Sequence, residues 1–399
     1  MKIQPCSRLA LIVITASISL PCALCTGSEI VTDGVLGGEP PAFRMNMGAV
    51  FSEDEEAADH LAGSVSGFLR AVVGGEGLEG YVTPEDQREH AFFFRALRNL
   101  GAPDGKLERS PLILKSFSPD GGESYLITVA FMRAGEDGDS VYRVIEFHAY
   151  PYDGGYRYKS PFVYNTRALR VRSIGSVRFH LSKALDESRA REFVEFKSMF
   201  EGLVGNPEAP LDYYCFETLD ELLRAHGIVY DCTRCNWLKE DLGFLDNNGG
   251  AFITGSGDER YIFEYLVDYM AERCDEDSDL YPPFVYGIAT YFGDYGLSRD
   301  DMRTLKSQFR AELREKPGID FLAEFKKGRG SSVSRHFSCY VMSAFLCEEI
   351  VEQHGLEAMI RLAHAGRDGE RFFLLLEELL GVGEGGFHAL IERLIRGDG

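Results

Sequence analysis

Apolar residues recur at helical spacing near the start of the chain. Over 53–72, Leu61, Val65, Phe68, Leu69 and Val72 fall on one helical face, and 84–100 has the same kind of spacing. Segments with strand patterning then follow one another, separated by turns: 112–117, 125–133, 140–150, 156–163 and 169–181. Helices followed by consecutive strands predict an α+β unit, in which helices cover an antiparallel sheet.

From residue 182 onward the pattern is mainly helical. Helical spacing or composition marks 184–204, 217–226, 258–273, 283–293, 298–315, 336–354, 356–365, 368–380 and 385–396. One short strand is expected at 250–254. The fold class is therefore α+β, with a mainly helical second domain that carries a small sheet. We expect a signal peptide at 1–25, a tether at 26–50, the sheet domain at 51–204 and the helical domain at 205–399.

The first 25 residues have the features of an export signal. Lys2 and Arg8 precede a short apolar run over 9–14, and small residues stand at Ala23 and Cys25. The apolar run is too short to span a bilayer comfortably, so we expect a secreted or periplasmic protein without a membrane span. An N-terminal anchor is the alternative. A lipoprotein anchor at Cys22 or Cys25 matches less well, because Pro21 and Leu24 precede these cysteines.

The negative net charge of the chain argues against some classes of binding partner. The chain of 399 residues has 42 Lys+Arg against 63 Asp+Glu, a formal net charge of −21. Nucleic acids and anionic membranes both attract basic residues, so the composition argues against either as a partner. A peptide, protein or glycan ligand is compatible with it.

Six cysteines lie beyond the signal, all in the second half. In an exported protein an even number predicts disulfides, although their pairing stays open. Cys232-Thr233-Arg234-Cys235 lacks the second pair of ligands that a structural zinc site needs, so disulfides are the preferred interpretation. The six are Cys215, Cys232, Cys235, Cys274, Cys339 and Cys347.

Two segments of the second half suggest a family. One reads Tyr-Ile-Phe-Glu-Tyr-Leu-Val-Asp-Tyr-Met over 261–270, the other Pro-Pro-Phe-Val-Tyr-Gly-Ile-Ala-Thr-Tyr over 282–291. Together with the glycine-containing stops of the last helices, they make 205–399 resemble the peptidase-MA-like, gluzincin-type metallopeptidases. The resemblance implies a helix with His-Glu-x-x-His, whose histidines bind zinc from one face, and a second helix with a third ligand.

At the ligand positions that the resemblance implies, this chain departs from the family. Phe263 and Val267 stand in the two histidine positions, and Tyr286, 22 residues after Glu264, stands in the third. An aryl ring and an isopropyl group offer zinc no lone pair, and a phenol is a poor substitute for a carboxylate. Only Glu264, the base position, is kept. We therefore expect no zinc and no other cofactor.

These residues predict an exported, non-catalytic relative of the gluzincins that binds or scaffolds at the cell surface or outside the cell. The plain alternative is that 262–270 is an ordinary apolar stripe facing a core. Another is an active hydrolase, metallopeptidase-like or glycan-active, that uses Glu264, Asp268, His336 or Tyr340. Finally, the tyrosine-rich strands could bind a sugar or peptide by themselves.

Overall fold

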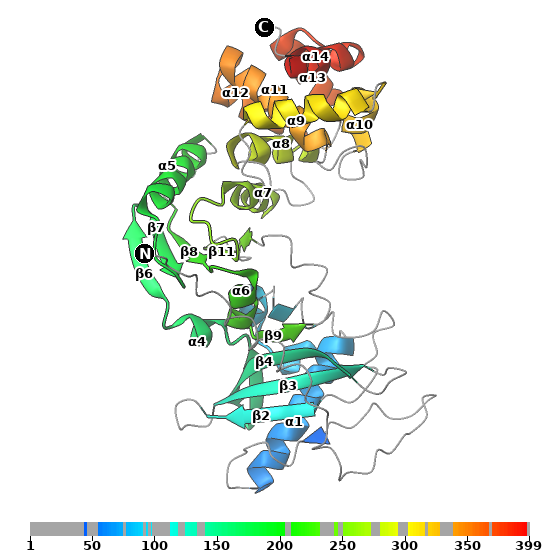
Figure 1. Cartoon of the computed structure of the whole chain (residues 1–399). Helices are drawn as coiled ribbons and strands as arrows, with labels where there is room; N and C mark the ends of the chain where they lie inside the picture. Colours follow the sequence, from blue (N-terminus) through cyan, green and yellow to red (C-terminus); the bar gives the residue numbers. More distant parts are fainter. Residues whose placement is uncertain are drawn as a thin grey trace, which may run out of the picture. The chain divides into compact units, whose positions relative to one another are not determined.

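The computed structural model combines two sheets with a mainly helical C-terminal region, as the sequence predicts (Figure 1). The expected signal segment and all of the tether except 44–45 lie outside the described residues. The structure describes residues 44–45, 55–74, 77–90, 93–94, 97, 112–118, 124–133, 140–203, 209–231, 243–245, 250–272, 280–293, 302–315, 318–327, 338–366 and 369–396.

Sheet A is the predicted meander. Its central strands follow the order β2-β3-β4-β5 with antiparallel pairing, while β1 pairs parallel to β2 and β9 antiparallel to β4. Along β4 every second side chain from Arg143 to Ala149 is buried, as expected when one face of a sheet is covered. The strands are β1 (Arg44–Met45), β2 (Leu112–Phe117), β3 (Tyr125–Arg133), β4 (Ser140–Tyr152), β5 (Gly155–Lys159) and β9 (Ile228–Asp231).

Helix α1 (Glu55–Gly74) covers sheet A (Figure 1). All five residues that the helical spacing selected are 2% exposed or less. The ring of Phe68 stacks on Tyr158 of β5 with 4.2 Å between centroids, and the Tyr158 hydroxyl donates to Ser64 Oγ at 2.8 Å. The short helices η1 (Leu78–Gly80) and α2 (Pro84–Glu89) follow α1.

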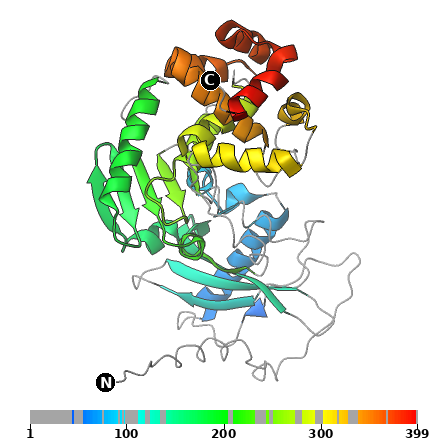
Figure 2. The same cartoon turned by 45° about the horizontal axis from the view of Figure 1, so that its top comes forward.

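Sheet B lies in the middle of the chain, with strand order β10-β11-β8-β7-β6. The outer pairs are antiparallel, and the pairs β11–β8 and β8–β7 are parallel. Helix α5 packs on one face (Figure 2), whereas α4 and α6 contribute to the apolar cluster on the other. The elements are β6 (Arg170–Ile174), β7 (Val177–Leu181), β8 (Leu211–Cys215), β10 (Gly243–Leu245), β11 (Ala251–Thr254), α4 (Phe162–Thr166), α5 (Glu187–Leu203) and α6 (Leu219–Ala225).

The C-terminal helices surround α11, whose first half is buried almost completely. Helix α11 contacts α8, α10, α12 and α14. Among the described residues, no helix is both long and apolar enough to cross a membrane. The helices are α7 (Ile262–Glu272), α8 (Pro282–Gly293), α9 (Met302–Glu315), α10 (Phe321–Lys327), α11 (Ser338–His354), α12 (Leu356–Ala363), α13 (Gly369–Leu380), η5 (Glu384–Gly386) and α14 (Phe387–Arg396).

Some expected elements differ from those observed. The strand expected over 169–181 is a hairpin, because Gly175 turns the chain with φ of +55° between β6 and β7. The strand expected to reach residue 163 ends at Lys159, and α4 begins beyond Pro161. Helix α10 and strands β8, β9 and β10 were not expected. The boundary expected at 204/205 falls inside sheet B, since β6 and β7 pair with β8 there, while β9 joins sheet A.

A buried histidine lies in the cluster between α4 and α6. His226 follows α6, is 3% exposed, and stacks on Phe162 with ring centroids 4.3 Å apart. Burial lowers the pKa of His226 to about 3. The folded protein therefore keeps this ring neutral at a pH at which the unfolded chain, with an ordinary histidine pKa of about 6.5, binds a proton.

Replacing His226 should make the protein less sensitive to acid. Between pH 6.5 and pH 3 only the unfolded state takes up this proton, so stability falls as pH falls. By linkage the loss from pH 7 to pH 5 is about 2 kcal/mol. The variant His226→Phe keeps a ring against Phe162 and should lose that part of the pH dependence in urea unfolding. His354→Gln, at an exposed site, is the control; an unchanged pH dependence in His226→Phe would contradict the assignment.

Candidate functional site

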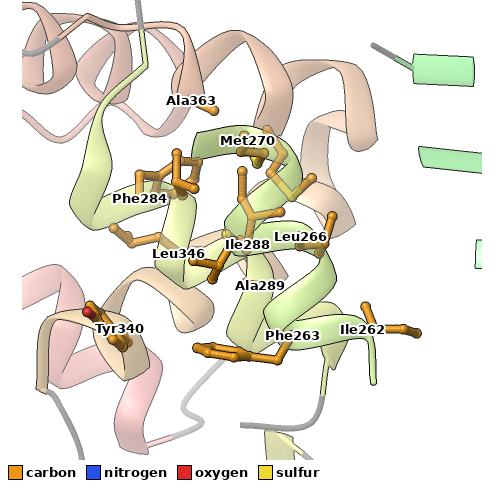
Figure 3. Packing of buried hydrophobic residues seen from close by; sticks show 14 of the residues in the cluster. Ile262, Phe263, Leu266, Met270, Phe284, Ile288, Ala289, Tyr340, Leu346 and Ala363 are labelled. Atoms are coloured by element: carbon orange, nitrogen blue, oxygen red, sulfur yellow. The ribbon is translucent and has the colours of Figure 1, made fainter. Parts of the chain in front are cut away.

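Helix α7, which carries most of the expected site residues, lies between two layers. Tyr265 faces sheet B and α5, with its ring edge-on to Phe193 and Phe252. Leu266 and Met270 belong to the cluster shared with α8 and α11 (Figure 3). Both sides of the helix are thus occupied, which explains why nearly every position in 262–270 is apolar or aromatic.

A buried ion pair defines the sheet-side contact of α7. Lys197 Nζ lies 2.7 Å from Glu201 Oε2, and both side chains are 2% exposed or less. The Tyr265 hydroxyl donates to the other carboxylate oxygen of Glu201 at 2.8 Å. Lys197 also donates to the carbonyl of Ala209 at 2.5 Å. Because buried charges are costly without partners, this network favours one rotation of α7 about its axis.

The loop that leads into α7 is held by charges as well. Arg189 of α5 binds the carboxylate of Asp258 with two hydrogen bonds, of 2.8 and 2.7 Å. Glu259, 1% exposed, pairs with Lys183 at 3.1 Å and accepts a hydrogen bond from the Asp186 backbone at 3.1 Å. Arg260 also pairs with Glu192 of α5 at 3.0 Å, so three ion pairs attach the start of α7 to α5 and the residues just before it.

The residues at the three expected ligand positions pack among the helices α7, α8 and α11. Phe263 and Val267 are 9% and 8% exposed, and their spacing of four places them on one face of α7. Tyr286 of α8 stacks on Tyr340 of α11, with centroids 4.4 Å apart and planes 10° apart. In Figure 3 the Phe263 ring extends from α7 towards Tyr340. Phe263, Tyr286 and Tyr340 thus come from three different helices.

The side chains at these positions do not fit a zinc ion. Phe263 and Val267 offer only carbon, and the Tyr286 ring is engaged face to face with another phenol. Glu264 and Asp268 are half-buried on the same helix. His336, another expected candidate, lies outside the described residues.

No protein-family model, curated protein or solved structure matches this chain. Membership of the gluzincin-like group is therefore a proposal, and it rests on the residues and packing of α7, α8 and α11.

The cysteines that the structure describes are buried. Cys215 in β8 and Cys347 in α11 carry free thiols, so neither forms the disulfide that the even count suggested. Burial raises the pKa of both thiols, which makes them poor nucleophiles. Cys339 is also buried. Cys232, Cys235 and Cys274 lie outside the described residues.

A histidine–aspartate pair on sheet B was not expected from the sequence. His180 Nε2 lies 2.7 Å from Asp212 Oδ1, and the His180 ring stacks on Tyr214 at 4.2 Å. Arg178 binds the same carboxylate and holds the pKa of Asp212 below its usual range. Only the parallel register of β7 and β8 brings these residues together. The Ser182 hydroxyl, two residues further along the chain, donates to Glu221 at 2.6 Å and is therefore engaged away from His180. We describe the His180–Asp212 pair as a structural contact.

An open groove of about 350 Å³ lies beside the start of α7. It combines acidic residues of α5 with apolar residues of α5, α7 and α8. None of the expected site residues lines it. Its lining is Glu192, Glu195, Phe196, Met199, Arg260, Ile262 and Phe292.

Two glycines let α8 approach its neighbours closely. A Cβ at Gly287 would lie 2.0 Å from Ser343 Cβ and 2.8 Å from the Ser343 backbone carbonyl carbon of α11. A Cβ at Gly293 would lie 2.5 Å from the backbone nitrogen of Phe263 in α7. Ser343 Oγ also donates to the Pro283 carbonyl at 3.0 Å. The contacts are backbone to backbone, so a larger residue at either position must move a helix.

Alanine at Gly287 should destabilise the protein, because helix α11 blocks the new methyl group. We expect a loss of about 1–3 kcal/mol or more in free energy of unfolding. Gly63→Ala is the matched control: Gly63 is exposed in α1 with open space around its Cβ, so alanine should stabilise by about 0.5–1 kcal/mol. Chemical denaturation measures both. Equal effects of the two changes would show that α8 and α11 are not so close.

Proposed function

We propose that this chain is an exported, non-catalytic relative of the gluzincin-type metallopeptidases that acts by binding or scaffolding. The proposal rests on the side chains that occupy the three positions where the family has its zinc ligands. Phe263 and Val267 are packed in a core, and Tyr286 is stacked on Tyr340. A peptide, protein or glycan is the class of ligand consistent with the acidic composition.

The order of elements supports the family part of the proposal. Helix α7 follows the antiparallel strands β10 and β11 at one edge of sheet B, and α8 packs against α7 directly afterwards. The resemblance requires such a pair of neighbouring helices, one for the first two ligands and one for the third. Gly293 makes their close approach sterically possible.

The chemistry of the remaining carboxylate supports the non-catalytic part. A glutamate base in a zinc peptidase deprotonates water that the metal has already acidified. Glu264 has no such ion beside it if positions 263, 267 and 286 supply no ligand. An unactivated water has a pKa far above that of a carboxylate, so Glu264 alone would take its proton only rarely.

Export rests on the first 25 residues of the sequence. The basic start, the short apolar run and the small residues at Ala23 and Cys25 are typical of a cleaved signal. A place at the cell surface or outside the cell follows from this interpretation.

Restoring the three ligands should create a zinc site. In Phe263→His/Val267→His/Tyr286→Glu, two imidazoles on one face of α7 and a carboxylate on α8 supply the donors that the family uses. We expect this triple variant to bind one more zinc per chain than the parent, measured by elemental analysis after dialysis. Taking the difference from the parent cancels any metal held elsewhere.

The control for this experiment is the double variant Phe263→His/Tyr286→Glu. With Val267 retained it lacks one ligand, so its affinity for zinc should be at least about 100-fold weaker than that of the triple variant. Circular dichroism checks that both variants are folded. A folded triple variant that binds no more zinc than the parent would contradict the assignment of these positions.

The parent should also lack hydrolytic turnover that depends on Glu264. We expect the purified chain and its Glu264→Gln variant to give the same background rate on a panel of fluorogenic peptides and glycosides. The reason is that the side chains at positions 263, 267 and 286 do not supply the ligands of a zinc ion that would acidify water for this carboxylate. Turnover by the parent that disappears in Glu264→Gln would instead support an active hydrolase.

A further inference from the structure

Far from α7 in the sequence, three metal-ligating side chains converge at helix α2. Asp86, Glu89 and His90 each place one ligand atom so that the three atoms lie within 4.8 Å of one another. Positions i, i+3 and i+4 of a helix share a face, which is why such a short segment can bring them together. Helix α2 ends at its C-cap residue His90, whose backbone N–H donates to the Asp86 carbonyl at 3.0 Å.

The carboxylate of Asp86 is held in place from two sides. Thr83, the N-cap of α2, donates its hydroxyl to Asp86 Oδ2 at 2.7 Å and accepts from the Asp86 backbone at 2.9 Å. Tyr150 of β4 donates to the same Oδ2 at 2.7 Å. Both donors use one oxygen, which leaves Oδ1 for another ligand. Donors that orient a ligating carboxylate in this way are typical of metal sites.

His90 is the second observation that points to a ligand. The side chain is 6% exposed, yet its ring makes no hydrogen bond to any residue that the structure describes. A largely buried imidazole is stabilised when its ring nitrogens meet a polar group or an ion. A cation bound between His90 and the two carboxylates would be such a partner.

We propose that Asp86, Glu89 and His90 form a binding site for a divalent transition-metal ion, with zinc as the ion of choice. One imidazole nitrogen and two carboxylate oxygens are ligands that zinc accepts at about 2.0–2.2 Å, with a fourth position left for water. Calcium and magnesium prefer oxygen ligands alone, so the histidine selects against them.

The site needs little movement to close. Ligand atoms around a tetrahedral ion lie about 3.4 Å apart, which is nearer than the present upper separation of 4.8 Å. Glu89 is exposed and can change rotamer freely, whereas Asp86 and His90 are held by their surroundings. The ammonium of Lys159, 5.0 Å from the Tyr150 ring centroid, is a positive charge that opposes cation binding at His90.

Zinc binding to the metal-stripped full chain tests the proposal by calorimetry. We expect one zinc per chain in the parent at this site, and at least tenfold weaker binding in Glu89→Gln. This variant removes an exposed carboxylate and should fold normally. The matched control is Glu85→Gln, on the same helix and of the same charge change, which should alter affinity less than twofold. His90→Ala should abolish binding at this site.

Cobalt substitution distinguishes this site from the cysteines. Cobalt held by nitrogen and oxygen gives weak visible bands, whereas thiolate ligands add strong ultraviolet charge-transfer absorption. The proposal fails if the stripped parent binds no zinc, or if Glu89→Gln and Glu85→Gln bind it equally well. Its failure leaves the proposed function untouched, because the restored-ligand experiment compares positions 263, 267 and 286 with the parent only.

Discussion

The arrangement of the C-terminal half depends on how α7 is fixed between sheet B and the helices α8 and α11. On the sheet side, Tyr265 donates to Glu201, which is paired with Lys197 in a place that water hardly reaches. Removing one partner of such a pair would leave an uncompensated buried charge, which typically costs about 3–5 kcal/mol. The network therefore specifies the rotation of α7, and that rotation decides which side chains of α7 face α8.

Given that rotation, the face of α7 toward α8 has to be apolar unless something binds there. Phe263 and Val267 lie on it, and Gly287 and Gly293 bring the backbones of α8 and its neighbours into contact. Histidines in so tight a space would need a metal or other partners for their ring nitrogens. The aromatic pair Tyr286–Tyr340 fills this space without a metal, since stacked rings bury apolar surface against each other. Under the proposed relationship to the gluzincins, a lost metal site and a well-packed core are the same structural feature.

Sequence patterns predicted the parts of the fold that repeat locally. The apolar face of α1 and the alternation along β4 follow from periods that are visible in a short window. Strand β8 was not predicted, because a segment of five residues is too short to show a clear alternation of apolar and polar positions. It is nevertheless the central strand of sheet B. The His180–Asp212 contact could not be seen either, since it needs the register of β7 against β8. The spacing of Asp86, Glu89 and His90 was visible in the sequence, but the donor Tyr150 comes from a strand 64 residues away.

The two candidate metal positions of this chain differ in the one property that matters for coordination. At positions 263 and 267 the side chains offer only carbon, and at position 286 the side chain is a phenol whose ring stacks on Tyr340. At positions 86, 89 and 90 the donors are present, and one of them is a buried ring that makes no hydrogen bond to any described residue. Metal content of the whole protein therefore says nothing about α7 until it is assigned to residues. Zinc bound at α2 would lie beside Tyr150 of sheet A and not beside Glu264, so finding it would leave the assignment of positions 263, 267 and 286 unchanged.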